Sequence, residues 1–454
     1  MAFDVQGYLR SLTRFGMKPG LQRIKAILGR LGHPEAAFPA VHIGGTNGKG
    51  STAAMTAAIL QRAGYRVGLY TSPHLIAYNE RIRVDGRPIS DEALEAVFEE
   101  VAAAADAVRE ELGSDPTEFE VGTAAAFLHF RRAAVDVAVV EVGLGGRLDS
   151  TNVVHSRAVG IGPISLDHTA ILGPDLASIA REKAGIFRPG VPAVLAPQEP
   201  GAAAVFREAA HALGTPLIWV REKGKEEGGQ GEPVGSGCGE ALYTVVDWGP
   251  HGGRFHLETP GAVYQDLHIS LLGLHQIQNA AVAVALTEAL AGAGFAVSEE
   301  AVRQGLSEAR WPGRFELFPG EPPILLDGVH NPGGARAFAA SFGRLFPGVR
   351  PVFVVAVTGQ KDLREVLGPL LRYAAAVVAT RPVSSRLPAV DPERLAECAR
   401  ELGVESVACP DAGAALDAAV ERAGPGGMVC VCGSLYLVGD VRALLVARAA
   451  HTLQ

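Results

Sequence analysis

The stretch GGTNGKGST, residues 44–52, decides the fold class, because a glycine-rich turn here joins an apolar run to an Ala-rich segment. It resembles the phosphate loop G-x-x-x-x-G-K-[ST], in which backbone N–H groups surround phosphates, the Lys contacts the terminal ones and the hydroxyl contacts Mg²⁺. The match is imperfect, because Gly50 separates Lys49 from Ser51 and Ile43 stands where the first motif glycine belongs. These residues alone are compatible with a phosphate site and with a tight structural turn.

Short apolar runs alternate with Ala-rich helical stretches on both sides of this turn. The runs are rich in β-branched residues and end in Gly, Pro or polar residues, which is typical of strands. They cover residues 38–45, 66–73, 135–146, 158–168 and 191–197. The alternation predicts an α/β protein whose first domain has a mainly parallel, P-loop-type sheet covered on both faces.

Polar side chains stand at the ends of four of these predicted strands. They are Asn47 to Ser51 after the first, Ser72 and His74 after the second, Glu141 late in the third, and Asp167 and His168 after the fourth. Ligands of parallel sheets bind beyond the carboxyl ends of the strands. This convergence favours a phosphate site over a structural turn. Residues 51–65 look helical, so a helix N-terminus adds its partial positive charge to the loop.

Composition indicates an ordinary globular protein that is large enough for more than one domain. The chain has 454 residues, of which 48% are hydrophobic and 20% charged, with a net charge of −8 and a pI near 5.9. This acidic balance argues against an extended nucleic-acid surface. The sequence shows neither a signal-peptide layout nor an apolar run of roughly 18 residues. We therefore expect a cytoplasmic protein with no nucleic-acid partner and no membrane partner.

The five cysteines include no C-x-x-C pair. They form neither a disulfide framework nor a zinc pattern, so we interpret them as buried small hydrophobic residues.

The pattern changes after the fifth apolar run. Residues 221–240 are polar, Gly-rich and without periodicity, which predicts a mobile surface loop to which we assign no function. Three strand-like runs follow and predict a small antiparallel appendage, and then an apolar helix ends near Gly292 or Gly294. A second alternating series comes last. We predict a first domain over residues 1–310 and a smaller Rossmann-like α/β domain over residues 311–454.

Nine segments between residues 44 and 335 follow one another in a specific order: GTNGKGS, TSPHL, NERIRVDG, EVGLGGRLDSTN, SLDHTAILG, REKAGIF, HQIQNA, WPGRFE and LDGVHNP. They resemble the folylpolyglutamate synthase and dihydrofolate synthase family of the Mur ligase superfamily, in which the extra glycine after the Lys is normal. The resemblance implies an ATP-dependent ligase. ATP phosphorylates a carboxylate of dihydropteroate or a reduced folate, and the amino group of L-glutamate then displaces the phosphate.

The resemblance also implies which residues bind ATP and Mg²⁺. ATP is placed on Asn47, Gly48, Lys49, Gly50, Ser51, Asn279, Arg314 and Asp327. Cationic groups must surround a phosphoryl group that moves between anions, so Lys49 and Mg²⁺ are expected to supply positive charge. The implied Mg²⁺ ligands are Ser72, Glu141 and His168, a mixed donor set that suits a hard cation, and two ions are expected.

Two further residues are implied in catalysis, each with an alternative. Lys183 matches a lysine that CO₂ carbamylates in many Mur-type ligases, and the alternative is a helix-surface Lys or a salt bridge to Glu182. His330 resembles a residue placed near the incoming glutamate, and the alternative is a loop imidazole that caps the NPGG turn. Because ATP contacts come from both domains, closure is expected to exclude water from the acyl phosphate.

The site for the pterin-bearing acceptor is marked less clearly. The resemblance places it along Pro73, His74, Thr117, Glu118, Arg147 and Asp149. Asp149 is a candidate partner for pterin N–H donors. For Glu118 and Glu120, helix capping is the alternative.

Two stretches carry weaker implications. NERIRVDG is interpreted as a flexible loop near the acceptor groove, with Arg81 and Arg83 as solvated strand residues in the alternative reading. Residues 357–366 match the family only loosely. A role for Lys361 and Asp362 at the glutamate site is therefore open.

Two other functions remain as alternatives. A Mur ligase of cell-wall synthesis generally carries an N-terminal nucleotide-sugar domain, whereas only 43 residues precede Gly44 here. A P-loop regulatory NTPase would consume ATP without glutamate. The sequence leaves open whether the ligase accepts both dihydropteroate and folates or only lengthens polyglutamate tails. Its expected partners are small molecules, and we expect a monomer.

Overall fold

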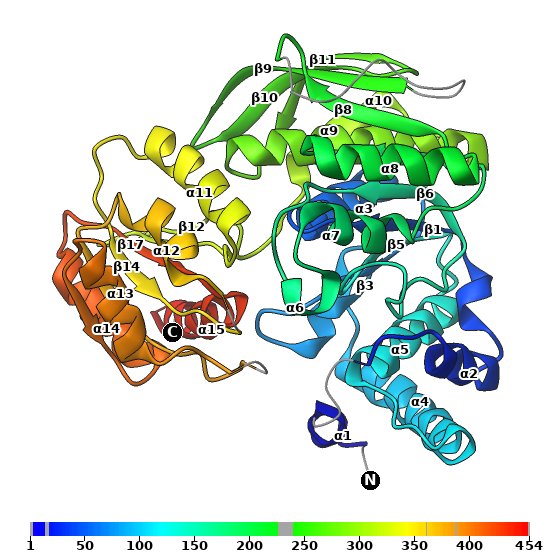
Figure 1. The fold of residues 1–454 in the computed structure, drawn as a ribbon, viewed down its shortest axis with the longest axis horizontal. Coiled ribbons are helices and arrows are strands. Elements are labelled where there is room, and N and C mark those ends of the chain that lie inside the picture. The colour runs from blue at the N-terminus through cyan, green and yellow to red at the C-terminus, as the bar shows by residue number, and fades with distance from the viewer. Residues whose placement is uncertain (1–2, 14–17, 226–238, 360, 386–387, 453–454) are drawn as a thin grey trace.

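The computed structural model describes residues 3–13, 18–225, 239–359, 361–385 and 388–452, and two β-sheets define its architecture (Figure 1). Within these residues, the larger sheet has eleven strands in the order β11-β10-β9-β8-β7-β6-β1-β5-β2-β3-β4. The smaller sheet has six, in the order β12-β13-β17-β14-β15-β16. The predicted fold class, a mainly parallel α/β domain followed by a smaller α/β domain, is confirmed.

Six parallel strands form the centre of the larger sheet. They are β1 (Ala40–Gly44), β2 (Val67–Tyr70), β5 (Val137–Glu141), β6 (Ser156–Ile161), β7 (Ala193–Leu195) and β8 (Leu217–Glu222). β1 is buried along its whole length because helices cover both faces of the sheet. Val41 and Ile43 of β1 pack on one side, and Ala40 packs on the other.

Two groups of helices cover these faces. One group packs with Val41 and comprises α3 (Lys49–Arg62), α9 (Leu274–Ala289), continued by η3 (Leu290–Ala293), and α10 (Glu299–Glu308). The other comprises α5 (Glu118–Arg132), α7 (Leu176–Ala184) and α8 (Pro200–Leu213), with α1 (Val5–Thr13), α2 (Gln22–Arg30), η1 (Pro34–Ala37) and α4 (Asp91–Leu112) around α5. The short α6 (Thr169–Leu172) precedes α7. Helix α9 itself ends at Ala289, and η3 continues the helical segment to Ala293, next to the predicted end at Gly292 or Gly294.

The predicted antiparallel appendage is instead part of the larger sheet. β9 (Gly239–Gly249), β10 (Gly252–Glu258) and β11 (Val263–Ile269) are antiparallel to one another, but β9 pairs in parallel with β8. Leu257 and Leu267 pack in the same core as α9, so these strands extend the sheet. Of the predicted surface loop, residues 226–238 lie outside the described part of the chain. Its first two residues, 221–222, belong to β8, and its last two, 239–240, belong to β9.

At the opposite edge of the larger sheet, the structure differs from a second prediction. The NERIRVDG stretch forms η2 (Tyr78–Arg81) and β3 (Ile82–Val84), and β3 pairs antiparallel with β2 and with β4 (Arg87–Pro88). It is therefore regular structure and not a loop. Arg81 is 4% exposed, so it is not a solvated strand residue.

The smaller sheet is parallel except for its edge strand β12 (Glu316–Phe318). The others are β13 (Ile324–Leu326), β14 (Val352–Val355), β15 (Ala376–Ala379), β16 (Ser406–Ala408) and β17 (Val429–Cys432). One face packs against α11 (Pro332–Leu345), α12 (Leu363–Leu371) and α13 (Pro392–Glu401), and the other against α14 (Ala412–Ala423) and α15 (Leu435–Thr452).

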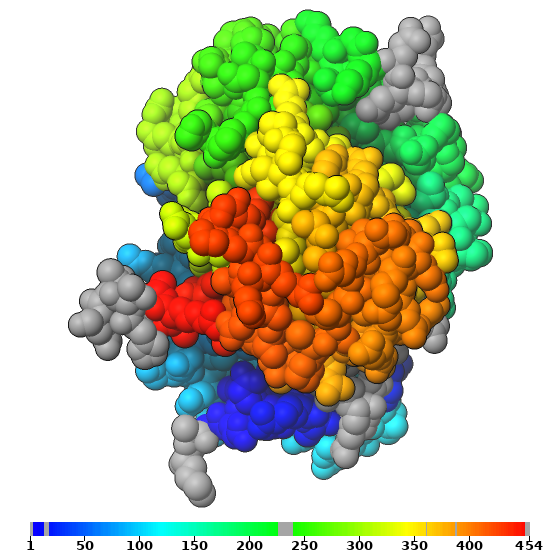
Figure 2. Space-filling view, turned by 90° about the vertical axis from the view of Figure 1, so that its left-hand side faces the viewer, coloured from blue at the N-terminus to red at the C-terminus, as the bar shows by residue number. Residues whose placement is uncertain are grey.

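A short linker, residues 309–315, joins α10 to β12 and so connects the two sheets. Figure 2 looks onto the part built around the smaller sheet, coloured yellow to red, which lies in front of the part built around the larger sheet. The carboxyl ends of β1, β2, β5 and β6 and the loop after β13 contribute residues to one cavity.

Two further expectations from the sequence concern the cysteines and membrane-spanning helices. Cys398, Cys430 and Cys432 are buried free thiols and Cys409 is half-buried, whereas Cys238 lies outside the described residues. In the described ranges, no helix combines the length and the apolar character needed to cross a membrane.

Candidate active site

The phosphate loop lies between β1 and α3. Gly48 has a φ of 80°, and a Cβ atom there would stand 2.5 Å from Asn279 Oδ1, so the position requires glycine. Helix α3 begins directly afterwards at Lys49, which adds the helix N-terminus to the loop. Lys49 Nζ donates to the carbonyl oxygens of Gly45 and Thr46, at 3.1 and 3.2 Å. The ammonium group therefore lies over the loop.

The linker explains the extra glycine of the motif. A Cβ atom at Gly50 would stand 2.8 Å from Trp311 Nε1 and 2.9 Å from Trp311 Cζ2. The indole packs against the first turn of α3 and leaves no room for a side chain. Trp311 thus contacts the phosphate loop, a role that the sequence did not assign to it.

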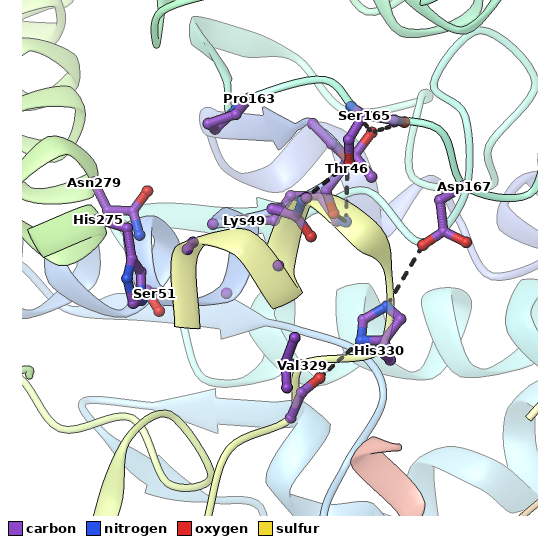
Figure 3. Close-up of a pocket in the computed structure, with 18 of the residues that line it drawn as sticks. Thr46, Lys49, Ser51, Pro163, Ser165, Asp167, His275, Asn279, Val329 and His330 are labelled. Carbon is purple, nitrogen blue, oxygen red and sulfur yellow. Dashed lines mark hydrogen bonds and ion pairs between the residues drawn. The ribbon is translucent and has the colours of Figure 1, made fainter. Parts of the chain in front are cut away.

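A cavity of about 440 Å³ opens beyond the phosphate loop (Figure 3). Its walls contain all residues predicted to bind ATP or Mg²⁺ or to act in catalysis: Asn47, Gly48, Lys49, Gly50, Ser51, Ser72, Glu141, His168, Lys183, Asn279, Arg314, Asp327 and His330. Pro73 also lines this cavity, and His74 lines a smaller neighbouring one. The structure brings these residues together, while their individual roles stay predictions.

The predicted Mg²⁺ ligands have suitable chemistry. Glu141 ends β5, and its Oε2 accepts a hydrogen bond from Ser72 N at 3.0 Å. Burial raises the pKa of the Glu141 carboxyl, and the charges of Lys49 and Arg314 oppose this rise. Burial lowers the pKa of His168, which favours the neutral imidazole that binds metals.

These ligands do not form a self-evident metal cluster. Among the described residues, no group of three or more His, Cys, Asp or Glu side chains is placed to hold a metal ion. The predicted set therefore depends on the hydroxyl of Ser72 beside the carboxylate and the imidazole. The donor types fit Mg²⁺, and the ligand assignment stays a prediction.

Lys183 is buried beside the phosphate loop. It is 4% exposed, and its Nζ donates to Gly45 O at 2.8 Å. Burial and then the charge of Lys49 lower the pKa of Lys183 to about 7. Both alternatives for Lys183 are wrong, because it is not on the surface and Glu182 instead pairs with Arg147 at 2.8 Å.

The second domain adds a carboxylate and a guanidinium to the cavity. Asp327 follows β13 and accepts hydrogen bonds from Phe315 N and Val329 N, at 2.9 and 2.8 Å. Burial raises the pKa of Asp327, and the charge of Arg314 opposes the rise. A Cβ atom at Gly328 would stand 2.0 Å from Arg314 Nη1, so the glycine lets the guanidinium lie against the backbone.

His330 is held by two oxygen atoms. Its Nδ1 is 2.8 Å from Gly328 O, and because a carbonyl only accepts, Nδ1 carries the proton. Its Nε2 lies 3.6 Å from Asp167 Oδ2. His330 does not cap the following turn, because Asn331 caps α11 by accepting from Gly334 N at 2.8 Å. The capping alternative for His330 is therefore wrong.

Thr117 begins α5 with a reciprocal cap. Its Oγ1 accepts from Glu120 N at 3.2 Å, and Glu120 Oε2 accepts from Thr117 N at 2.7 Å. The capping alternative therefore holds for Glu120. Glu118 points elsewhere, with Oε1 3.8 Å from Arg81 Nη1.

Arg81 orients His74 from inside the protein. Its Nε donates to His74 Nδ1 at 2.9 Å, and its guanidinium lies 4.7 Å from the centre of the Tyr78 ring. Because His74 Nδ1 accepts this hydrogen bond, the proton of the neutral imidazole is on Nε2. Arg81, which the alternative reading placed in solvent, is thus buried and orients His74, a predicted acceptor residue.

The remaining predicted acceptor residues lie away from the cavity walls. Arg147 is exposed and paired with Glu182. Asp149 is buried and accepts from Leu144 N at 2.8 Å and from Thr151 N at 3.0 Å. Neither these two residues nor Thr117 and Glu118 line the cavity, and their contact with an acceptor stays a prediction.

Several residues of the cavity walls were not predicted from the sequence to bind a ligand or act in catalysis. They include Ser165, Asp167 and His275, together with Gly328. Asp167 was named from the sequence as a polar residue at a strand end, next to a predicted metal ligand, but it was given no role of its own. The sequence carried no comparable signal for His275. In the structure, burial and then the charge of Arg314 lower the pKa of His275 to about 4.

Fold and site together define a class of protein, a P-loop ATP-dependent ligase built from two α/β domains. The Mur ligase middle domain matches residues 43–287, and the Mur ligase glutamate ligase domain matches residues 313–435. The chain is therefore a Mur-type ligase.

Relatives that match along nearly the whole chain narrow this class to a family. The dihydrofolate synthase/folylpolyglutamate synthase of Bacillus subtilis is 37% identical over 445 residues, which cover 97% of this chain and 98% of the relative. The chain belongs to the folylpolyglutamate synthase and dihydrofolate synthase family.

Solved structures agree with this family. Escherichia coli FolC in complex with DHPP and ADP superposes with a TM-score of 0.84 at 32% identity, covering 98% of each chain. A bifunctional folylpolyglutamate synthase/dihydrofolate synthase with Mn, AMPPNP and L-glutamate bound gives a TM-score of 0.80 at 32% identity, covering 97% of each. A nucleotide and a divalent metal therefore belong to this type of site.

Proposed function

We propose that this enzyme uses ATP to join L-glutamate to a carboxylate of dihydropteroate or a reduced folate. One observation carries the proposal: a phosphate loop, an acidic side chain and a buried lysine of the first domain share a cavity with Arg314 and His330 of the second. The solved relatives hold ADP with DHPP in one case, and AMPPNP, Mn and L-glutamate in the other. Between them, those ligands include a nucleotide, a divalent metal and L-glutamate, which are the classes of ligand that this chemistry requires.

The reaction has two steps. An acceptor carboxylate oxygen attacks the terminal phosphorus of ATP, and ADP leaves. The glutamate nitrogen then attacks the acyl carbon, phosphate leaves and the nitrogen loses a proton. Lys49 and Arg314 offset the negative charge that gathers in the first step, because both phosphate and carboxylate are anions. Mg²⁺, held by Ser72, Glu141 and His168, would add charge stabilisation.

Two positions have more specific proposed roles. His330 stands near the incoming glutamate, with its Nδ1 proton committed to Gly328 O. Lys183 reacts as a neutral amine with CO₂, which forms an N–C bond, releases a proton and gives a carbamate. That anion would support a second Mg²⁺, and the remaining N–H would keep the hydrogen bond to Gly45 O. The low pKa of Lys183, about 7, favours the reactive amine.

For the pterin-bearing acceptor, we propose the same binding residues as from the sequence. Pro73 and His74 are on or next to the cavity walls. Thr117, Glu118, Arg147 and Asp149 would line a groove that continues away from them, with Asp149 receiving pterin N–H groups. As from the sequence, we also propose a monomer that acts in the cytoplasm.

A direct assay tests the function. The enzyme is supplied with ATP, Mg²⁺ and L-glutamate, and with dihydropteroate or tetrahydrofolate in turn, and the products are identified by mass. We expect one added glutamyl unit on at least one acceptor, and the pair of results separates a bifunctional enzyme from one that only lengthens tails. Lys49→Ala should abolish the product, whereas Lys25→Ala, on the exposed side of α2, should not.

The same assay separates the alternatives. A regulatory NTPase would release phosphate with neither acceptor nor glutamate present, whereas the ligase should release it only with an acceptor. No glutamylated product from either acceptor would reject the proposed function.

A further inference from the structure

Asp167 is a carboxylate of the first domain that three groups of the second domain surround. It follows β6, and its side chain is 9% exposed. Asn331 Nδ2 donates to Asp167 Oδ2 at 3.0 Å, His330 Nε2 lies 3.6 Å from the same oxygen, and Lys361 Nζ lies 3.9 Å from Oδ1. Figure 3 shows Asp167 and His330 facing each other across the cavity. We call these four residues with Asn47 the Asp167 cluster.

The orientation of the Asn331 amide is settled by its neighbours. Its oxygen accepts from Gly334 N at the start of α11, so its nitrogen must face the other way. That nitrogen donates both to Asp167 Oδ2 and to Asn47 Oδ1, the latter at 2.9 Å. Asn47 Nδ2 in turn donates to Ser165 Oγ at 3.0 Å. One amide therefore links the second domain to the phosphate loop and to Asp167.

The second domain reaches Asp167 through two separate segments. His330 and Asn331 precede α11, while Lys361 precedes α12. Lys361 Nζ also donates to His330 O at 2.5 Å, which ties these segments together. Hydrogen bonds to a charged group are stronger than neutral ones, and a buried carboxylate that loses its partners is costly. The cluster is thus the charged contact that holds these segments over the phosphate loop.

We propose that Asp167 and Asn331 are positioning residues that dock the second domain, so that His330 is presented to the glutamate only when the phosphate loop is in its described shape. This inference rests on the proposed function. When docking fails, water attacks the acyl carbon of the acyl phosphate in place of glutamate. The carbon–oxygen bond to phosphate breaks, the carboxylate re-forms, and phosphate and a proton are released without an amide.

The test measures phosphate released per amide formed, together with the KM for glutamate and for ATP. The variants are Asp167→Ala and Asn331→Ser, since Ser still caps α11 but has no amide to bridge the domains. For each we expect the glutamate KM to rise about tenfold, the effect of one lost charged hydrogen bond, and the phosphate-to-amide ratio to exceed that of the wild type. The ATP KM should change much less.

Three comparisons sharpen the test. The double variant should lose less than the sum of the two single losses, because both changes remove the same hydrogen bond between Asn331 and Asp167. Asp411→Ser alters the cap of α14, on the other face of the smaller sheet, and should leave the phosphate-to-amide ratio unchanged. The Mg²⁺ concentration for half-maximal activity should be the same in Asn331→Ser and the wild type, which separates docking from an effect on His168.

Specific results would overturn the proposal. They are an unchanged glutamate KM with a wild-type phosphate-to-amide ratio in Asn331→Ser, or fully additive losses in the double variant. If the wild type itself makes no glutamylated product, the proposed function fails instead, so the two failures are distinguishable.

Discussion

Two lysines donate to one carbonyl oxygen, and they differ in how deeply they are buried. Lys49 and Lys183 donate to Gly45 O at 3.1 and 2.8 Å. Lys49 is half-buried, whereas Lys183 is 4% exposed, and burial and the neighbouring ammonium lower the pKa of Lys183 to about 7. Above about pH 7, Lys183 thus offers a neutral amine beside the phosphate loop.

The low pKa of Lys183 predicts a pH-dependent stability. Between about pH 7 and 10.5 the unfolded chain holds a proton on this amine that the folded chain lacks, so the free energy of unfolding should rise with pH. Below pH 7 both states are protonated there and the slope should vanish. Relative to Lys183→Met, the wild type should gain up to about 1.4 kcal/mol per pH unit in that window. Urea unfolding in CO₂-free buffer measures the difference, and a constant difference would contradict the pKa.

Gly50 allows a second prediction for a single residue. An added methyl group would collide with the Trp311 indole, so Gly50→Ala should lower the free energy of unfolding by about 1–3 kcal/mol and raise the KM for ATP. Gly201 is a matched control, because it is also helical and a Cβ atom there would meet nothing within 4 Å. Gly201→Ala should be neutral or slightly stabilising. Equal behaviour of the two variants would show that the indole does not limit this position.

At the scale of elements, α5 shows how one cap positions a helix beside His74, a predicted acceptor residue. Thr117 and Glu120 satisfy each other's backbone N–H groups, and Arg23 Nε donates to Glu120 Oε2 at 3.1 Å. This fixes the start of α5, from which Glu118 reaches Arg81. The helix thus connects the cap to the residue that orients His74.

The cap should be measurable by substitution. Thr117→Val keeps the shape of the side chain but removes its hydroxyl, so we expect a loss of about 1 kcal/mol in the free energy of unfolding. Thr117→Ser keeps the hydroxyl and should retain most of the stability. Urea denaturation of the two variants checks this, and a larger loss in Thr117→Ser than in Thr117→Val would show that the methyl group matters and the cap does not.

Sequence patterns predicted the elements whose signals are local. The parallel strands and the helix after the phosphate loop follow from apolar runs and glycine turns, which are read within a few residues. The pairing of β9 with β8 and the burial of Arg81 depend on partners elsewhere. Glu118 lies 37 positions after Arg81, and no pattern within either segment announces their contact. Predictions failed where distant side chains decide the environment.

At the scale of the whole molecule, the site is divided between two sheets. Asn331 and Asp167 are 164 positions apart and yet 3.0 Å from each other through Nδ2 and Oδ2. The resemblance implied that both domains would contribute. It did not predict which side chains would meet, because the relative placement of two sheets leaves no periodic signal in either.

Nucleotide binding should stabilise the whole molecule. AMPPNP with Mg²⁺ at a hundredfold excess over its Kd should add about 2.7 kcal/mol to the free energy of unfolding. Differential scanning fluorimetry would record this as a higher Tm. Lys49→Ala should lose most of the shift, while Lys25→Ala should keep it. A full shift in Lys49→Ala would mean that the nucleotide binds without the phosphate loop.

The linker between the sheets has a consequence for how the enzyme can move. Trp311 packs on Gly50 and Arg314 lines the cavity, so the segment about which the halves must pivot is also a part of the nucleotide pocket. A change in the angle between the halves therefore displaces an indole and a guanidinium at the same time. We therefore expect nucleotide affinity and interdomain angle to change together, so that each reports on the other.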